Sequence, residues 1–461
     1  MHARRFLRPL CAALLAVLLF GACTSARSQR QPPRSQGGEG RPNVLVVVTD
    51  DQPINSMAAM PKTVDWFRRG THFTNFYVTT PQCCPSRSSI LTGRYVHNTH
   101  VIDNSAALEL DQRTTIERYL HDAGYETGLF GKFLNAWPAG RPPPYFDHFA
   151  LTRHSARAYH DSYWNVDGDR RFVHEFDVDF IYSQAARFID AADASQRSWF
   201  AYLAVAAPHA PFETEARNQG AAVPPWHGDP AVFERDRSDK PSYVRARHSS
   251  FAKGRKIRTG QLRSLMSVDD MLGRLHALLA RKEALSDTLV ILLSDNGLGW
   301  GQHGLTGKAV PYTFSIQVPM FMSWPGHIPS RSSDGRMAAN IDITPTILDA
   351  AGLHPRLVAP LDGRSLLQEW RRKVVLTEFW NRRSGGVPQW ASLRSKRWQY
   401  VEYYGPDGRS PRIREYYDLE HDPWQLHNLL GDRDPANDPS NVPELSRRLS
   451  AARGCSGSSC P

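Results

Sequence analysis

Two continuous apolar runs, each ending in polar residues, constrain the fold of this chain most strongly. Val44–Val48 contains only valine and leucine, and Asp50-Asp51 follows it almost at once. Leu289–Leu293 is a second run of this kind, and it leads into Asp295-Asn296. Runs that are apolar at every position are typical of strands buried on both faces of a parallel sheet. In open α/β sheets, ligands bind beyond the carboxyl ends of such strands, where both polar pairs are expected.

Other segments extend this pattern into an α/β fold. Apolar residues at helical spacing over Leu262–Leu279 predict a crossover helix, and Phe200–Val205 predicts a third strand that ends near His209. Strands alternating with helices predict a mixed, mainly parallel sheet sandwiched by helices. Residues 136–175 and 213–260 lack clean periodicity, so they are predicted to be long loops over the carboxyl edge of the sheet.

The pattern changes after Leu367. Short strands are predicted at Val374–Glu378, Trp398–Tyr403 and Arg414–Leu419, and a final helix at Val442–Ala452. We therefore divide the folded chain into a large α/β domain at residues 42–370 and a smaller C-terminal subdomain with an antiparallel sheet at residues 371–461.

The N-terminus has the pattern of an export signal. Two arginines precede an apolar run at residues 10–20 that is too short to span a bilayer, and small residues follow it. Residues 1–23 are therefore predicted to be a signal peptide, and the protein is expected outside the cell or in the cell envelope. Cys23 also fits a bacterial lipobox, so lipid anchoring and simple cleavage both stay open. Residues 24–41 are predicted to form a disordered tether, because they contain almost no apolar residue.

Charge and cysteines add two further expectations. The formal net charge of +10 fits an anionic partner but does not identify one. Nucleic acid is disfavoured, because the chain shows no basic-aromatic stripe and no zinc-ligand spacing.

Cys455 and Cys460 close a short loop at the end of the chain, where an exported protein is expected to carry a disulfide.

The polar pairs at the two strand ends predict a metal site. Asp50, Asp51, Asp295 and Asn296 offer three carboxylates and one amide, an all-oxygen set that suits Ca²⁺ or, less often, Mg²⁺. The alternative is that the aspartates only cap helices, which Asp does well. Two such pairs in one chain favour the metal.

A further motif begins at Cys83. Cys83-Cys84-Pro85-Ser86-Arg87 is followed by Leu91-Thr92-Gly93. This run resembles the signature of the formylglycine-dependent (type I) sulfatases, Cys-x-Pro-Ser-Arg followed by Leu-Thr-Gly. The resemblance implies an alkaline-phosphatase-like fold and one calcium ion. It also implies that a formylglycine-generating enzyme oxidises Cys83 to formylglycine, which becomes a further metal ligand. A structural Cys-Cys pair at a turn is the alternative, but every motif position matches in register.

The resemblance also implies a mechanism. Hydrated formylglycine carries two hydroxyls on one carbon. One attacks sulfur and displaces the alcohol, and deprotonation of the other expels sulfate and restores the aldehyde. Preorganised cations stabilise the negative charge of the transition state. The residues that match the family's catalytic positions are Arg87, Lys132, Lys308 and His209, and the histidine is expected to contact sulfate and protonate the leaving oxygen.

The chain departs from the family at one position. Many sulfatases carry a histidine two residues after the lysine that matches Lys132, where this chain has Leu134 followed by Asn135. That histidine is credited with deprotonating the hemiacetal hydroxyl. Either another group, with His303 as a candidate, or water takes this role.

Matches to one branch of the family extend over residues 41–461. This branch contains the N-acetylglucosamine-6-sulfatases and the extracellular heparan sulfatases. The matching segments include Arg41–Val44, Gly131–Asn135, Ser267–Asp270, Asn340–Thr346 and Cys455–Cys460. The resemblance implies sulfate esters on glucosamine-type sugars of glycosaminoglycans as substrates, such as N-acetylglucosamine 6-sulfate.

Three other functions stay open. One is an arylsulfatase of broad specificity. Another is a phosphoester hydrolase of the alkaline phosphatase superfamily, although those relatives generally use serine or threonine with two zinc ions and histidine-rich sites. The third is a non-catalytic binder of sulfated glycans, which the intact Cys83, Arg87 and Lys308 disfavour.

Overall fold

The computed structural model describes residues 40–152, 159–381, 386–405, 407–408 and 410–461. The signal peptide and lipobox predicted at residues 1–23, and the tether predicted at 24–41 up to residue 39, lie outside the described residues. From residue 40 onward the described chain belongs to one compact unit. None of the helices in the described segments combines the length and apolar character that a membrane span requires.

The main sheet contains ten strands in the order β10-β2-β9-β8-β1-β7-β3-β4-β5-β6. Strands β8, β1, β7, β3 and β4 run parallel to one another at the centre, and β10 pairs parallel with β2. Strands β9, β5 and β6 pair antiparallel with their neighbours. This arrangement confirms the predicted mixed, mainly parallel sheet. In sheet order the strands are β10 (Ser332–Ala339), β2 (Thr71–Tyr77), β9 (Met320–Ser323), β8 (Thr288–Ser294), β1 (Asn43–Thr49), β7 (Trp199–Ala204), β3 (Glu126–Gly131), β4 (His148–Thr152), β5 (Ser162–Val166) and β6 (Asp169–Val173).

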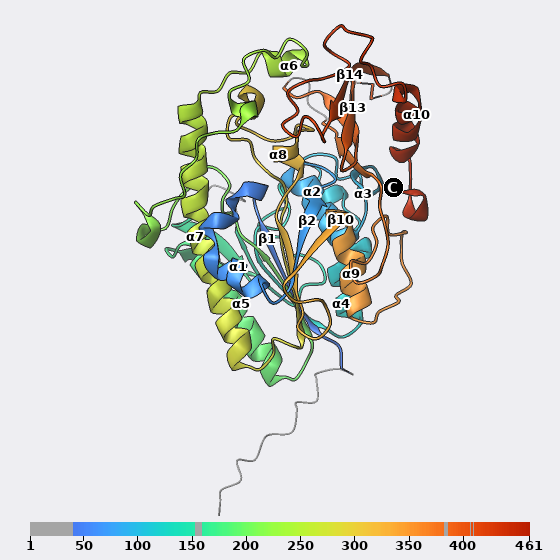
Figure 1. The fold of residues 1–461 in the computed structure, drawn as a ribbon. Coiled ribbons are helices and arrows are strands. Elements are labelled where there is room, and N and C mark those ends of the chain that lie inside the picture. The colour runs from blue at the N-terminus through green and yellow to red at the C-terminus, as the bar shows by residue number, and fades with distance from the viewer. Residues whose placement is uncertain (1–39, 153–158, 382–385, 406, 409) are drawn as a thin grey trace, which may run out of the picture. The chain divides into compact units, whose positions relative to one another are not determined.

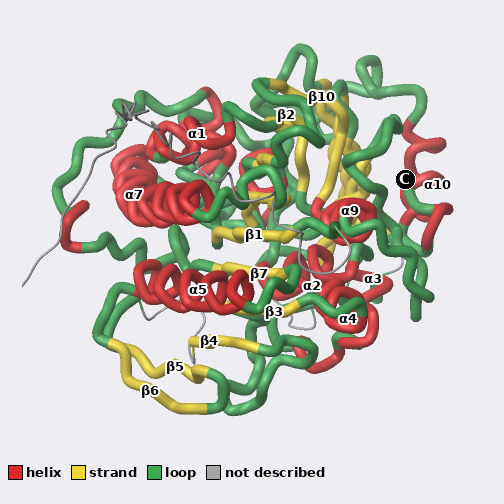
Figure 2. The backbone as a smooth tube through the Cα atoms, turned by 90° about the horizontal axis from the view of Figure 1, so that it is seen from below, coloured by secondary structure: helices red, strands yellow, loops and turns green. Residues whose placement is uncertain are grey.

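Helices cover both faces of this sheet (Figure 1), and Figure 2 shows the two groups from below. One group is α1 (Pro61–Phe67), α5 (Asp177–Ala194) and α7 (Phe251–Arg281), and the other includes α2 (Cys83–Thr92), α4 (Ile116–Asp122) and α9 (Ile343–Ala350). Successive residues of β1 point to opposite faces, so Val46 packs into one core and Val47 into the other. Shorter or peripheral helices are α3 (Val96–Thr99), α6 (Ser242–Arg245), α8 (Thr313–Ile316) and α10 (Val442–Ala452).

Two segments predicted to be loops contain regular structure, so those predictions were wrong. Residues 136–175 include β4, β5 and β6, which extend one edge of the main sheet. Residues 251–260 form the first turns of α7, a helix that was expected to begin at Leu262. The helix begins after Ser250, whose hydroxyl accepts a hydrogen bond from the Lys253 amide at 3.1 Å. Its first turns contain Lys253, Arg255, Lys256 and Arg258 and few apolar residues, so they carry no apolar stripe that periodicity could detect.

A second, antiparallel sheet follows in the C-terminal part of the chain. Its strands, in order, are β11 (Val375–Phe379), β12 (Gln389–Arg394), β13 (Trp398–Tyr404) and β14 (Pro411–Asp418). The sequence predicted β11, β13 and β14 but missed β12. Trp390 of β12 and Tyr400 of β13 belong to the same hydrophobic core as Val46 of the main sheet. The domain boundary at residue 370 stays a prediction.

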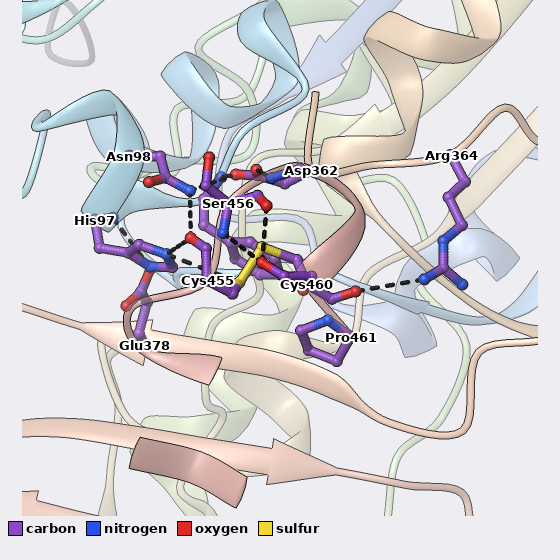
Figure 3. The surroundings of a disulfide bond; sticks show 12 residues. His97, Asn98, Asp362, Arg364, Glu378, Cys455, Ser456, Cys460 and Pro461 are labelled. Carbon is purple, nitrogen blue, oxygen red and sulfur yellow. Dashed lines mark hydrogen bonds and ion pairs between the residues drawn. A yellow bond between two sulfur atoms is a disulfide. The ribbon is translucent and has the colours of Figure 1, made fainter. Parts of the chain in front are cut away.

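The predicted disulfide between Cys455 and Cys460 is confirmed, and its loop lies against the segment that follows α2 (Figure 3). The carbonyl of Cys455 accepts hydrogen bonds from His97 and Asn98, each at 2.9 Å. Asp362 joins the disulfide loop to α3. It accepts a hydrogen bond from the Asn98 side-chain amide at 2.8 Å and one from the Gly457 backbone amide at 2.7 Å. The end of the chain is therefore attached to the helical layer of the main sheet.

Candidate active site

The carboxyl ends of β1 and β8 bring the two polar pairs together. These strands are parallel neighbours with Thr49 opposite Ser294, so Asp50-Asp51 and Asp295-Asn296 leave the sheet side by side. All four side chains are buried. The backbone amide of Asp51 donates to Oδ1 of Asp295 at 3.3 Å. Asp51 has a left-handed backbone with φ of +68°, a conformation that costs a non-glycine residue about 1–2 kcal/mol.

Helix α2 places Cys83 against this cluster. The helix begins at Cys83, and the thiol donates to Oδ1 of Asp50 at 3.5 Å. The next backbone amide, of Cys84, donates to the side-chain oxygen of Asn104 at 3.0 Å, a capping contact that the sequence did not reveal. Gly93 ends the helix with φ of +66°, a conformation that favours glycine and explains the Leu-Thr-Gly ending.

Arg87 lies one turn further along α2 and is fully buried. Its Nε donates to Oδ2 of Asp295 at 2.8 Å, and its terminal nitrogen Nη2 lies 3.5 Å from Oδ2 of Asp50. Its other terminal nitrogen donates to the carbonyl of Lys132 at 2.8 Å. Arg87 therefore joins the two strand ends and the segment after β3.

Two lysines complete the charged cluster. Lys132 follows Gly131 at the end of β3, and its Nζ contacts Oδ2 of Asp50. Gly131 has φ of +112°, and a Cβ there would lie 2.1 Å from the carbonyl oxygen of Ala204, so this position requires glycine. Nζ of Lys308 contacts Oδ1 of Asp51 and lies 2.8 Å from Sγ of Cys83.

His209 lies at the more accessible side of the cluster. Its side chain is 25% exposed, whereas the aspartates are nearly inaccessible. Its Nε2 lies 3.6 Å from Oδ2 of Asp51, and its Nδ1 lies 2.7 Å from the carbonyl of Ala210. Since that carbonyl can only accept, Nδ1 carries a proton and Nε2 faces the cluster. Ligand atoms of Asp50, Asp51, Cys83 and His209 all lie within 4.8 Å of one another.

Burial and charge compete in setting the pKa values of this cluster. Burial alone would raise the pKa of Asp50, but Lys132 and the other nearby cations lower it below its ordinary value. Burial, reinforced by Asp50, raises the pKa of the Cys83 thiol to about 12. Burial opposes the charge of Lys308, yet Asp51 and the neighbouring acidic groups raise its pKa well above the ordinary value. The site is therefore a cluster of paired charges around a neutral thiol.

Leu134, at the position of the missing family histidine, and the candidate His303 are both buried. Leu134 is buried in the core, and the carbonyl of Asn135 lies 3.7 Å from Sγ of Cys84. His303 is also buried, with Nδ1 2.8 Å from Oε2 of Glu234 and its ring centroid 4.5 Å from that of Tyr312 in a tilted arrangement. The His303 ring thus contacts Glu234 and Tyr312. Water stays the alternative for deprotonating the hemiacetal hydroxyl.

The small C-terminal sheet binds the segment that carries Lys308. The indole of Trp390 donates to the carbonyl of Ala309 at 2.9 Å, and the amide of Gln399 donates to the carbonyl of Pro311 at 2.7 Å. The hydroxyl of Tyr312 donates to Glu415 at 2.9 Å. Sequence analysis missed these contacts, because nothing local marks Trp390 or Gln399 as partners of this segment.

All nine residues predicted for the site therefore lie in one cluster at the carboxyl edge of the main sheet. They come from α2 and from the segments after β1, β3, β7 and β8, with Lys308 on the long segment before α8. They are Asp50, Asp51, Cys83, Arg87, Lys132, His209, Asp295, Asn296 and Lys308.

Comparisons with known proteins agree with this arrangement. The family model described as Sulfatase matches residues 42–353, and the model described as N-sulphoglucosamine sulphohydrolase, C-terminal, matches residues 301–453. An extracellular sulfatase homologue of Caenorhabditis elegans is 36% identical over 71% of this chain. The chain spans 48% of that relative's length, which is about half.

Two further comparisons cover more of both chains. Human N-acetylglucosamine-6-sulfatase is 28% identical, over 98% of this chain and 90% of the human protein. A solved structure in complex with its substrate D-glucosamine-2-N,6-O-disulfate is 21% identical, with a TM-score of 0.77 over 89% of this chain and 97% of that chain. At this identity the structural likeness supports the fold alone.

Proposed function

Since this chain belongs to the sulfatase family, we propose that it hydrolyses sulfate esters by means of an oxidised Cys83 and one bound calcium ion. The surroundings of Cys83 carry the proposal. Its sulfur lies 3.5 Å from a carboxylate oxygen of Asp50 and 2.8 Å from the ammonium of Lys308, at the edge of the sheet where ligands bind. A formylglycine at this position would lie between the proposed metal ligands and a cation that can bind sulfate.

The donors present fit a calcium ion. Asp50, Asp51, Asp295 and Asn296 supply oxygen ligands, with the modified Cys83 as a further ligand. Nζ of Lys308 contacts Asp51 and lies 3.3 Å from the side-chain oxygen of Asn296, so these oxygens already face a positive group. When bound, calcium supplies positive charge that polarises sulfuryl oxygens.

The side chains of the cluster perform the remaining steps of the proposal. Lys308 binds a sulfuryl oxygen, because its ammonium lies next to Cys83 and is partly exposed. Lys132 and Arg87 are fully buried, so they hold the orientation of Asp50 and add positive charge behind the reacting group. His209 holds a proton near the ester oxygen of the leaving group, which fits its position at the accessible side of the cluster.

We propose sulfated glucosamine-type sugars as the substrate class. The support is the similarity to N-acetylglucosamine-6-sulfatases over nearly the full chain. An aryl sulfate is the simpler alternative substrate, and a phosphate ester is the alternative from the wider superfamily.

Maturation requires a formylglycine-generating enzyme as a partner. We further propose export, with the lipid anchor at Cys23 left as an option, in line with the relatives described as extracellular sulfatases.

The decisive experiment tests the modification and the activity together. The protein is produced with and without a formylglycine-generating enzyme, and the peptide containing Cys83 is analysed by mass spectrometry. We expect a loss of about 18 Da at Cys83 and hydrolysis of an aryl sulfate only in the modified preparation. Cys83→Ala abolishes this activity, while Cys84→Ala is the matched control and retains it. Full activity of Cys83→Ala would refute the proposal.

A second set of assays identifies the substrate and the metal. Glucosamine 6-sulfate and its N-acetyl form are compared with other sulfated sugars, aryl sulfate and aryl phosphate. We expect the highest kcat/KM on a 6-sulfated glucosamine. A chelator should abolish the activity, and calcium should restore it more effectively than magnesium. A preference for aryl phosphate would favour the phosphoester hydrolase instead.

A further inference from the structure

Gln261 connects three segments of the candidate active site from behind. It lies on α7, and its side chain is fully buried. Its Nε2 donates to the carbonyl of Asp51 at 2.9 Å and to the carbonyl of Pro208 at 3.3 Å. Its Oε1 accepts a hydrogen bond from the indole of Trp300 at 2.6 Å. Both amide hydrogens and the carbonyl oxygen of one side chain are thus used.

The three partners belong to the segments that follow β1, β7 and β8. Asp51 follows β1 and is a proposed calcium ligand. Pro208 follows β7 and directly precedes His209. Trp300 follows β8, four residues after Asn296. Gln261 is therefore bound to every one of the strand-end segments that supply the proposed metal ligands and the proposed proton donor.

Two features show what the hydrogen bonds of Gln261 control. Asp51 has a left-handed backbone, which is unfavourable for a residue with a side chain, and the hydrogen bond to its carbonyl holds that conformation. Asp51 and His209 face each other at 3.6 Å, and Gln261 binds the backbone of Asp51 and of the residue before His209. Because α7 is a helix of 31 residues packed on the sheet, it provides a rigid support for both.

We propose that Gln261 is a positioning residue that fixes the Asp51 carboxylate and His209 relative to each other. The role rests on the proposed function, because it matters for catalysis only if these groups bind calcium and protonate the leaving group. The side chains nearest to glutamine in shape cannot make the same three hydrogen bonds. Glutamate lacks the two donors, asparagine is one carbon too short, and leucine has a similar volume but no polar atom.

The test compares Gln261→Leu and Gln261→Glu with wild-type protein that carries formylglycine. Gln184→Leu is the matched control, because Gln184 is a buried glutamine on the neighbouring helix α5. Two quantities are measured for each variant. One is kcat and KM on an aryl sulfate, and the other is the calcium concentration that gives half of the maximal thermal stabilisation.

We expect both Gln261 variants to lower kcat roughly 10-fold to 100-fold, because small misplacements of reacting groups have effects of this size. KM should change less, since Gln261 contacts no substrate. The half-saturating calcium concentration should rise roughly 10-fold, the size of effect seen when groups that support metal ligands are altered. Gln184→Leu should lower the melting temperature but leave kcat and the calcium response near the wild-type values.

Several outcomes would overturn the role of Gln261. Wild-type kcat and calcium response in both Gln261 variants would refute it, and so would equal losses in Gln184→Leu, which would indicate a general packing effect. If Gln261→Leu does not fold, Gln261→Glu decides, because it keeps the side-chain shape and the bond to Trp300. If the wild-type protein responds to calcium but hydrolyses no sulfate ester, the proposed function fails, and the calcium titration still decides on Gln261.

Discussion

The indole of Trp390 donates a hydrogen bond to the carbonyl of Ala309 at 2.9 Å, and this bond joins the small C-terminal sheet to the segment that carries Lys308. Ala309 has a left-handed backbone, with φ of +68°. The contact spans 81 positions of the sequence. Through this hydrogen bond, the C-terminal sheet supports the segment that carries Lys308 of the candidate active site.

Trp390→Phe tests this support. The variant keeps the aromatic packing but leaves a carbonyl without its donor, which costs about 1–3 kcal/mol of stability. We expect kcat/KM on an aryl sulfate to fall roughly 10-fold, because Lys308 loses part of its support. Trp398→Phe is the control on the neighbouring strand β13, and it should alter stability only. Equal kinetic losses in both variants would contradict a specific role of Trp390.

Lys308→Ala tests the proposed binding of sulfate. Removing a cation aimed at developing negative charge should lower kcat/KM roughly 100-fold to 1000-fold. Lys308→Arg keeps the charge but not the compact ammonium, so it should recover only part of the loss. Lys396→Ala, at an exposed lysine, should match the wild type. Near-normal turnover by Lys308→Ala would show that Lys308 is not needed for sulfate binding.

Glu117 should make the stability depend on pH. It is buried in the first turn of α4, and burial raises its pKa from 4.5 to about 8. As pH rises through this range, the unfolded chain loses its proton while the folded protein keeps it. The free energy of unfolding should therefore fall between about pH 4.5 and pH 8 and then level off.

Glu117→Gln removes this titration with little change of shape. Denaturant unfolding at a series of pH values should show the variant more stable than wild type above pH 8, by a difference on the order of a few kcal/mol. Glu369→Gln, at an exposed glutamate, serves as the control and should follow the wild-type curve. Parallel curves for wild type and Glu117→Gln would disprove the raised pKa.

The terminal disulfide should contribute moderately to stability. Its cysteines are five positions apart, so the closed loop is short and the chain-entropy model gives about 2 kcal/mol. The double variant Cys455→Ser, Cys460→Ser should lower the denaturant midpoint by a corresponding amount. Reductant should shift the wild-type midpoint to the same value and leave the variant unchanged. A variant as stable as the oxidised wild type would rule out this contribution.

Local patterns predicted much of the architecture. The apolar runs that became β1 and β8 identified two central parallel strands, since burial on both faces leaves no polar positions. The final helix agrees with its predicted bounds. Several strands with mixed patterns were missed, among them β12 and the strands β4, β5 and β6 at one side of the main sheet. The sequences of these strands mix polar and apolar residues, so their apolar pattern is weak, even in β12, which is mostly buried.

By itself, the sequence determined the acidic pairs after the buried strands and the motif at Cys83, because both are properties of adjacent residues, and the family resemblance added Lys132, His209 and Lys308. Only the tertiary structure decided what holds them in place. Gln261 meets Asp51 across 210 positions, and Trp390 meets Ala309 across 81. Such contacts depend on how strands and helices pack, and the ordinary local sequence around a buried glutamine or tryptophan does not encode its distant partner.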